Sequence, residues 1–183
     1  RIREVSIEDL LGREAVHLET ELMQDWIGGK NIMVTGAGGS IGSELCRQIA
    51  RMKPKNLLLV ERAEPALFAI GREITSDYPE VNARSILCDV QDESRVLEVF
   101  DRERPHVVFH AAAHKHVPLM ESNPGEAIKN NVFGTVNVAE AADRFHVQSF
   151  VFVSTDKAVN PTSIMGTTKR VAEIYTRALS KES

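Results

Sequence analysis

The sequence predicts an α/β protein with a doubly wound parallel sheet of strand order 3-2-1-4-5. Five short apolar segments alternate with longer stretches whose apolar residues recur at helical spacing. A glycine-rich turn joins the first apolar segment to the first helical stretch, and the second apolar segment ends on a glutamate. Successive strand–helix units build a parallel sheet with helices on both faces, because the crossovers are right-handed.

Each expected element follows from its local pattern. The strands are expected at residues 31–35, 56–61, 83–88, 106–110 and 149–153. The helices between them are marked by apolar residues at three- or four-residue spacing: Ile41, Leu45 and Ile49; Leu67, Ile70 and Ile74; Val96, Val99 and Phe100; and Ile128, Val132, Val136 and Ala139. A fifth helix is expected from about Ser163 to the end of the chain.

Residues 1–28 are charged and mixed, and we interpret them as a lead-in segment ahead of a domain at 29–183. A short turn capped by Ser6 is expected at 6–12. One helical face in the lead-in is marked by Leu18, Leu22 and Trp26.

Composition argues against several classes of protein. The chain is 43% hydrophobic and 26% charged, as in ordinary globular domains. Its net charge of −4 and lack of a lysine- or arginine-rich block argue against a nucleic-acid partner. No apolar run approaches the roughly 20 residues of a membrane helix, so these residues are not expected to contact a membrane. Cys46 and Cys88 stand without a partner motif, so neither a disulfide nor a metal site is expected.

The turn after the first strand has the form of a dinucleotide-binding loop, which makes the predicted fold Rossmann-like. Gly36 permits a tight turn, Gly39 allows close approach of a pyrophosphate, and Gly42 allows the helix to pack near the strand. The amides at the helix start favour phosphate oxygens. A glycine-rich turn that binds nothing is the alternative. The candidate loop residues are Gly36, Gly38, Gly39, Ser40, Ile41 and Gly42.

Acidic residues end the next two strands. Glu61 can accept hydrogen bonds from ribose hydroxyls and would repel a 2′-phosphate, which favours NAD. The adjacent Arg62 can accommodate that phosphate, so NADP is not excluded; a solvated Glu61–Arg62 pair is the bland alternative. Asp89, followed by Val90, can reach an adenine amino group or cap a helix that begins near Gln91.

Several motifs together carry a family resemblance. The glycine spacing, Cys88-Asp89-Val90, His110-Ala111-Ala112-Ala113, Asn131 with Gly134-Thr135, and Ser154-Thr155-Asp156-Lys157 are similar to the extended short-chain dehydrogenase/reductases. A narrower resemblance, to the polysaccharide-biosynthesis nucleotide-sugar 4,6-dehydratases that act on UDP-N-acetylglucosamine, rests on Asp9-Leu10-Leu11-Gly12-Arg13, the loop from Gly36 to Glu44, Ala113-His114-Lys115-His116-Val117-Pro118 and Met165-Gly166-Thr167-Thr168-Lys169-Arg170.

The resemblance implies a lyase that oxidises the sugar at C4 with NAD, eliminates water across C5 and C6, and returns the hydride to C6. It also implies a longer protein, anchored at the cytoplasmic face of the inner membrane, with a UDP-linked amino sugar as substrate. The chain then corresponds to the cofactor-binding part, truncated before the substrate-binding region and inactive alone. A sheet that ends at the fifth strand would expose an edge, so a homo-oligomer is a further expectation. A nucleotide-sugar epimerase and a catalytically silent dinucleotide-binding module are the alternatives.

The candidate catalytic residues follow the fifth strand, where open α/β sheets bind ligands. Asp156 is the candidate acid at the C6 hydroxyl and Lys157 the candidate base at C5; burial under substrate would raise the pKa of Asp156. An Asp156–Lys157 ion pair without catalytic role is the alternative. Members of the superfamily usually carry Tyr-x-x-x-Lys, but here Met165 precedes Lys169. A thioether cannot accept the C4 hydroxyl proton, so Thr155, Asp156 or an ordered water is the candidate relay.

The remaining candidates lie in the segments that follow the fourth and fifth strands. Lys169 is expected to hydrogen-bond the nicotinamide ribose, with an ordinary helix-surface lysine as the alternative. Asn131 is expected to stabilise a helix and an ordered water rather than to perform chemistry, and Lys115 and His116 are expected to approach the substrate phosphates. The small residues expected to let the cofactor lie across the strand end are Ala111, Ala112 and Ala113.

Overall fold

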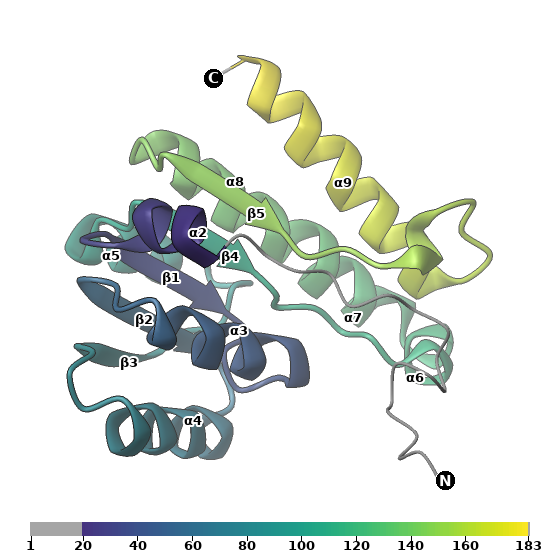
Figure 1. Cartoon of the computed structure of the whole chain (residues 1–183). Coiled ribbons are helices and arrows are strands. Elements are labelled where there is room, and N and C mark those ends of the chain that lie inside the picture. Colours follow the sequence, from purple (N-terminus) through teal and green to yellow (C-terminus); the bar gives the residue numbers. More distant parts are fainter. Residues whose placement is uncertain (1–19, 183) are drawn as a thin grey trace, which may run out of the picture.

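The structure, a computed structural model, describes residues 20–182 (Figure 1). The turn expected at 6–12 and Leu18 of the expected lead-in helix lie outside the described residues. The helix α2 (Thr20–Ile27) covers the rest of that expected face. Ile27 is fully buried, and the Trp26 ring packs edge-on against Phe109 at 6.1 Å between centroids. Leu22 is exposed, so the buried face of α2 includes Ile27 rather than Leu22.

The described strands form one parallel sheet in the order β3-β2-β1-β4-β5, which confirms the predicted fold class and strand order. In the register, Thr35 of β1 pairs with Val60 of β2 and with His110 of β4. β3, β4 and β5 are each one residue shorter than predicted. The strands are β1 (Asn31–Thr35), β2 (Asn56–Glu61), β3 (Ala83–Leu87), β4 (Val107–His110) and β5 (Ser149–Phe152).

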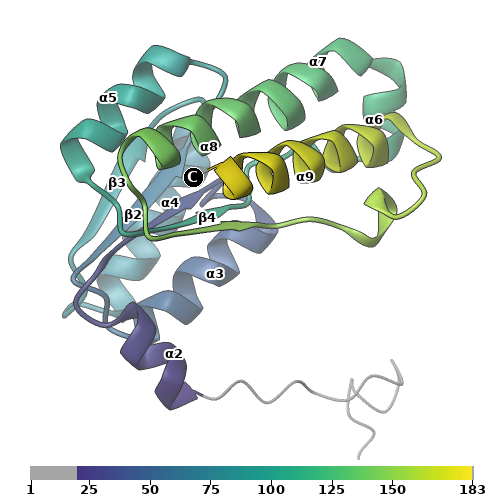
Figure 2. The same ribbon diagram turned by 90° about the horizontal axis from the view of Figure 1, so that it is seen from above.

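Helices cover both faces of the sheet (Figures 1 and 2). On one side, α3 (Ser40–Arg51) and α4 (Glu64–Asp77) pack against Leu57 and Leu59; on the other, α5 (Glu93–Glu103) and α8 (Gly134–Arg144) pack against Leu58 and Val60. Successive side chains of a strand point to opposite faces, so a leucine run is buried on both. Ile41 is exposed because it lies in the first turn of α3, at the edge where the strands end.

The region after β4 differs from the single helix that the sequence predicts. It contains α6 (Val117–Ser122), α7 (Pro124–Ile128), a π-helical turn at Lys129–Phe133, and then α8. A π turn inserts a residue into the helical repeat and rotates the face that follows. Ile128, in α7 ahead of the π turn, is exposed, whereas Thr135 and Val138, which follow the turn, are buried.

The last described element is helix α9 (Ile164–Glu182), which begins close to the start predicted for the fifth helix. This helix packs against α6, α7 and α8. A short 3-10 turn, Asp156–Ala158, lies between β5 and α9. Because all strands run parallel, the segments that follow them gather at one edge, where the candidate site is built.

Candidate functional site

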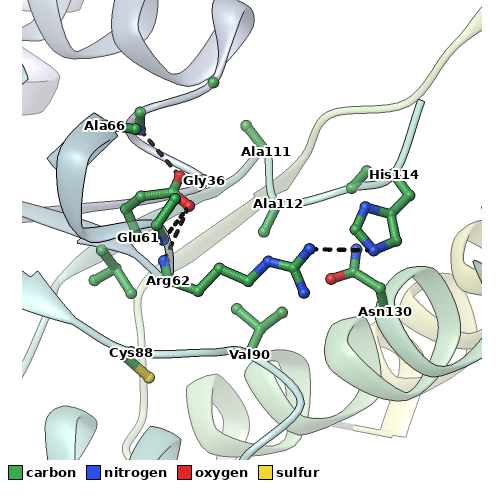
Figure 3. Close-up of a pocket in the computed structure, with 15 residues that line it drawn as sticks. Gly36, Glu61, Arg62, Ala66, Cys88, Val90, Ala111, Ala112, His114 and Asn130 are labelled. Atoms are coloured by element: carbon green, nitrogen blue, oxygen red, sulfur yellow. Dashed lines mark hydrogen bonds between the residues drawn. The ribbon is translucent and has the colours of Figure 1, made fainter. Parts of the chain in front are cut away.

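A cavity of about 330 Å³ opens at the edge where the strands end (Figure 3). Of the residues predicted to bind the cofactor, it is lined by Gly36, Gly38, Gly39, Glu61, Arg62, Val90, Ala111, Ala112 and Ala113. The others, which lie outside its lining, are Ser40, Ile41, Gly42, Asp89, Asn131 and Lys169. The lining residues that the sequence reasoning missed are Val60, Ala63, Ala66, Cys88, His114 and Asn130. Most of the missed residues are small or apolar neighbours, which carry no chemical signal in sequence.

The glycine loop has the geometry that its sequence predicts. Gly36 has a φ of +68°, and a Cβ there would lie 2.8 Å from the backbone of Ala112. A Cβ on Gly42 would overlap the carbonyl oxygen of Gly36. These two glycines therefore hold the loop close both to α3 and to the segment after β4.

The Glu61 carboxylate holds the backbone of the loops around it. Its Oε2 accepts a hydrogen bond from the amide of Gly38 at 3.1 Å, while Oε1 accepts from the amides of Arg62 and Ala63 at 2.9 and 3.0 Å. The interpretation of Glu61 and Arg62 as a solvated side-chain pair is therefore incomplete. Glu61 connects the end of β2 to the glycine loop, and no sequence motif predicts this role.

The Arg62 side chain extends across the cavity toward the segment after β4 (Figure 3). One terminal nitrogen lies 3.3 Å from Nε2 of His114, and the other lies 3.6 Å from Oδ2 of Asp89. Burial, and secondarily the nearby Arg62 charge, lower the pKa of His114. The neutral imidazole is thereby favoured as the acceptor for this cation.

Asp89 does not cap the following helix, which corrects one of the two predicted roles. Its Oδ1 accepts from the amide of Gln91 at 3.0 Å, and α5 begins two residues later. The capping residue is Asp92, whose side chain accepts from the amide of Arg95. Both aspartates precede the helix, and only the backbone conformation decides between them.

The side chain of Lys115, from the segment after β4, reaches the start of α3. The Nζ of Lys115 donates to Oγ of Ser40 at 3.0 Å. Gly39, at the N-cap position, offers no side-chain hydrogen bond to the helix amides. A cation and unpaired helix amides thus lie together beside the glycine loop, a combination that suits an anion. Lys115 thus lies beside the glycine loop, and its expected contact with the substrate phosphates stays a prediction.

Asn131 connects the segment after β4 to helix α9. Its side chain accepts from the amide of His114 at 2.8 Å, and donates to the carbonyl of His114 and to Oγ1 of Thr168 at 3.1 Å each. Asn131 is fully buried in the π-helical turn. Such turns occur often at functional sites, because they redirect side chains within a helix.

Thr155, Asp156 and Lys157 form a hydrogen-bonded group after β5. The Thr155 hydroxyl donates to Oδ1 of Asp156 at 2.9 Å, and the Lys157 ammonium lies 3.3 Å from the same oxygen. These two contacts, Thr155 first, lower the pKa of Asp156, whose side chain is 86% exposed. The carboxylate is solvated and paired here, and the raised pKa expected for Asp156 beneath a covering substrate stays a prediction.

Lys169 is buried, so its interpretation as an ordinary surface lysine is wrong. Only 4% of the residue is exposed, and its Nζ donates to the carbonyl of Val153 at 2.6 Å. The ammonium also lies 3.9 Å from the centre of the Phe152 ring. Burial lowers the pKa of Lys169 to about 8.

Met165 packs in a small apolar cluster with Met120 and Ala127. It is 3% exposed, and its carbonyl accepts from Oγ1 of Thr168. The position four residues before Lys169 is thus filled by core packing. No proton-transferring group is supplied there, as the sequence indicates.

His110 is a buried neutral side chain between β1, β4 and α8. The Thr135 hydroxyl donates to the carbonyl of Asn131, so its oxygen accepts from Nε2–H of His110 at 3.0 Å. Nδ1 then accepts from the Thr35 hydroxyl at 2.7 Å. Complete burial, aided by the charge of Lys169, lowers the pKa of His110 to about 3.

Residues 20–182 show neither a metal-binding cluster nor a helix that could span a membrane. Within this range, no three or more His, Cys, Asp or Glu side chains are arranged to hold a metal ion. Nor does any helix in this range have the length and apolar character to cross a membrane.

Comparison with known proteins identifies the relatives of this chain. It is 47% identical to the capsular polysaccharide biosynthesis protein CapD of Staphylococcus aureus, over all of this chain and 31% of that protein. It is 38% identical to a UDP-N-acetylglucosamine 4,6-dehydratase (inverting) of Campylobacter jejuni, and 34% identical to a UDP-glucose 4-epimerase of Rickettsia massiliae. Each of these matches covers 79% of this chain and 42% of the relative.

A solved structure and a family model complete the comparison. The X-ray structure of Pen from Bacillus thuringiensis matches with a TM-score of 0.78 at 34% identity, over 84% of this chain and 47% of that one. The chain thus spans less than half the length of these relatives. The model of the family described as polysaccharide biosynthesis protein matches residues 32–183. With these matches and the fold in agreement, the chain belongs to that family, among the nucleotide-sugar dehydratases and epimerases of the short-chain dehydrogenase/reductase superfamily.

Proposed function

We propose that this chain binds NAD in the glycine-loop cavity and that its protein is a 4,6-dehydratase for a UDP-linked amino sugar. The observation that carries the proposal is that this cavity and the Thr155-Asp156-Lys157 group both lie where the parallel strands end, with the buried Lys169 bonded to Val153 directly after β5. The dehydratase relative at 38% identity supports the choice of reaction.

The cavity fits a dinucleotide on the evidence of its own walls. Gly36 and Gly38 leave no room for a side chain, because added Cβ atoms would lie 2.8 Å from Ala112 and 2.6 Å from Ala66. The loop backbone is therefore bare, as pyrophosphate binding requires. Lys115 beside the start of α3 supplies positive charge for that group. Glu61 favours NAD, and calorimetry with NAD+ and NADP+ tests the preference; tighter NADP+ binding would assign Arg62 to the 2′-phosphate.

The reaction divides among the residues at the end of β5. When bound, NAD+ supplies the oxidising group for sugar C4. Lys157 is the proposed base at C5 and Asp156 the proposed acid at the C6 hydroxyl, with Thr155 as relay. Asp156 is ionised before substrate covers it, and burial under the sugar would raise its pKa toward that of a working acid. Lys169, whose ammonium is bonded to the carbonyl of Val153, is the proposed contact to the nicotinamide ribose.

The test uses the full-length protein that contains this chain, incubated with UDP-N-acetylglucosamine and NAD+. The proposal expects a 4-keto-6-deoxy product, and loss of that product in Asp156→Asn and Lys157→Met. Asp77→Asn, on the exposed end of α4, is the matched control. If water is retained in the product, the dehydratase assignment fails.

An epimerase is the second candidate, favoured by the 34% identity to a UDP-glucose 4-epimerase. The same incubation separates the two, because an epimerase yields a stereoisomer of unchanged mass. A catalytically silent module, suggested by the apolar packing of Met165, predicts unchanged activity of the whole protein in both catalytic variants.

A further inference from the structure

Arg62 separates two hollows at the edge of the sheet. It lines the glycine-loop cavity, and it also lines an adjoining, more open hollow with Leu87, Asp89 and Asp92. Its side chain is 43% exposed, so solvent reaches it from the open side. The position of this side chain therefore decides the shape of the cavity wall at the Glu61 end.

Two partners hold the guanidinium from opposite sides. His114 Nε2 contacts it at 3.3 Å across the glycine-loop cavity, and Asp89 Oδ2 lies at 3.6 Å on the side of the open hollow. An arginine is always protonated, so Nε2 of His114 must be the unprotonated acceptor. Without His114, the carboxylate of Asp89 remains as the stronger attraction and draws the guanidinium toward the open hollow.

His114 itself is fixed through its backbone rather than through Arg62. Asn131 binds both the amide and the carbonyl of His114, at 2.8 and 3.1 Å. A change of the His114 side chain therefore leaves these two hydrogen bonds in place. The His114 imidazole is thus a hydrogen-bond acceptor on a fixed backbone, and it orients the longer side chain of Arg62.

We propose that His114 is a positioning residue that holds the Arg62 guanidinium as one wall of the site for the adenosine half of the cofactor. The inference rests on the proposed function, that this cavity binds a dinucleotide. The adenosine half belongs at the Glu61 end, because the acidic residue that ends the second strand faces the ribose in folds of this kind. A guanidinium offers a flat cationic face to an aromatic base, and one that is already held loses less freedom on binding.

The test is calorimetry of this chain with adenosine monophosphate and with NAD+. We expect His114→Ala and Arg62→Ala each to weaken both ligands about tenfold, the scale of one lost charged contact. The double variant should bind no more weakly than Arg62→Ala, since the imidazole acts through the guanidinium. His114→Gln, whose side-chain carbonyl can accept from Arg62, should restore most of the affinity. His146→Asn and Arg72→Ala, at exposed positions elsewhere, are the matched controls.

Three results overturn the proposal. Additive losses in the double variant would mean that His114 and Arg62 act separately. Tighter binding in either alanine variant would make the pair an obstruction rather than a wall. Unchanged binding in both would remove any role. If the unaltered chain binds neither ligand, the cofactor proposal itself fails; if it binds and the variants match it, only the inference about His114 fails.

Discussion

The buried ammonium of Lys169 predicts an unusual dependence of stability on alkaline pH. Burial lowers its pKa from 10.5 to about 8, so the unfolded chain holds this proton more tightly than the folded chain. Below pH 8 the buried charge lowers the free energy of unfolding by about 3 kcal/mol. This destabilisation disappears as the pH rises toward the pKa of a lysine in the unfolded chain. Between about pH 7 and about pH 9, this residue should raise the free energy of unfolding by about 1 kcal/mol.

The comparison protein is Lys169→Met, which keeps a long unbranched side chain without the charge. Its absolute stability also changes, because the hydrogen bond to Val153 is lost, so the slope against pH is the quantity to compare. Cys46 and Cys88 have pKa values raised to about 12 and about 11 by burial, and they contribute a slope of the opposite sign. That contribution is common to both proteins and cancels in the difference.

Denaturant unfolding, followed by the fluorescence of Trp26, measures both proteins at several pH values. Trp26 reports on the core because its ring packs against Phe109. The unaltered chain should gain stability relative to the variant as pH rises. If the two curves run parallel from pH 7 to pH 9, the ammonium is solvated in solution and the reasoning from its burial is refuted.

Three further predictions concern the loop, the sheet and the end of β2. Gly42→Ala should destabilise the fold by roughly 1–3 kcal/mol and abolish dinucleotide binding, since its Cβ would overlap the Gly36 carbonyl; Gly125→Ala, with open space around it, should do neither, and calorimetry with denaturant unfolding checks both. His110 has a pKa lowered to about 3, so the chain should lose about 2 kcal/mol of stability from about pH 6.5 to about pH 4.5, and His110→Gln should lose that much less in the same unfolding assay. Glu61→Ala should weaken NAD+ more than NADP+ in calorimetry, because it frees the Gly38 amide for both cofactors but removes the repulsion of the 2′-phosphate for NADP+ alone; equal losses would contradict the preference for NAD.

The site residues divide by the kind of signal they carry in sequence. The glycine loop follows from local chemistry, because the backbone turn at Gly36 and the contact of Gly42 lie within a few residues of each other. The environment of Lys169 has no such signal, since its burial depends on Phe152 of β5 and on Val153 directly after that strand. The lowered pKa of Asp156 likewise has no signal in the sequence, because the exposure of its carboxylate is a property of the folded surface.

The amino-acid sequence by itself determined the fold class, the strand order and the loop that faces the cavity. The period of the apolar residues, the positions of the glycines and the right-handed hand of the crossovers are local or topological properties, so they can be inferred from the sequence alone. Only the tertiary structure decided that Arg62 meets His114, that Asn131 joins two distant segments, and that the π turn rotates the helix after it. Those contacts join residues far apart in the chain, and their geometry depends on how the segments pack across one edge of the sheet.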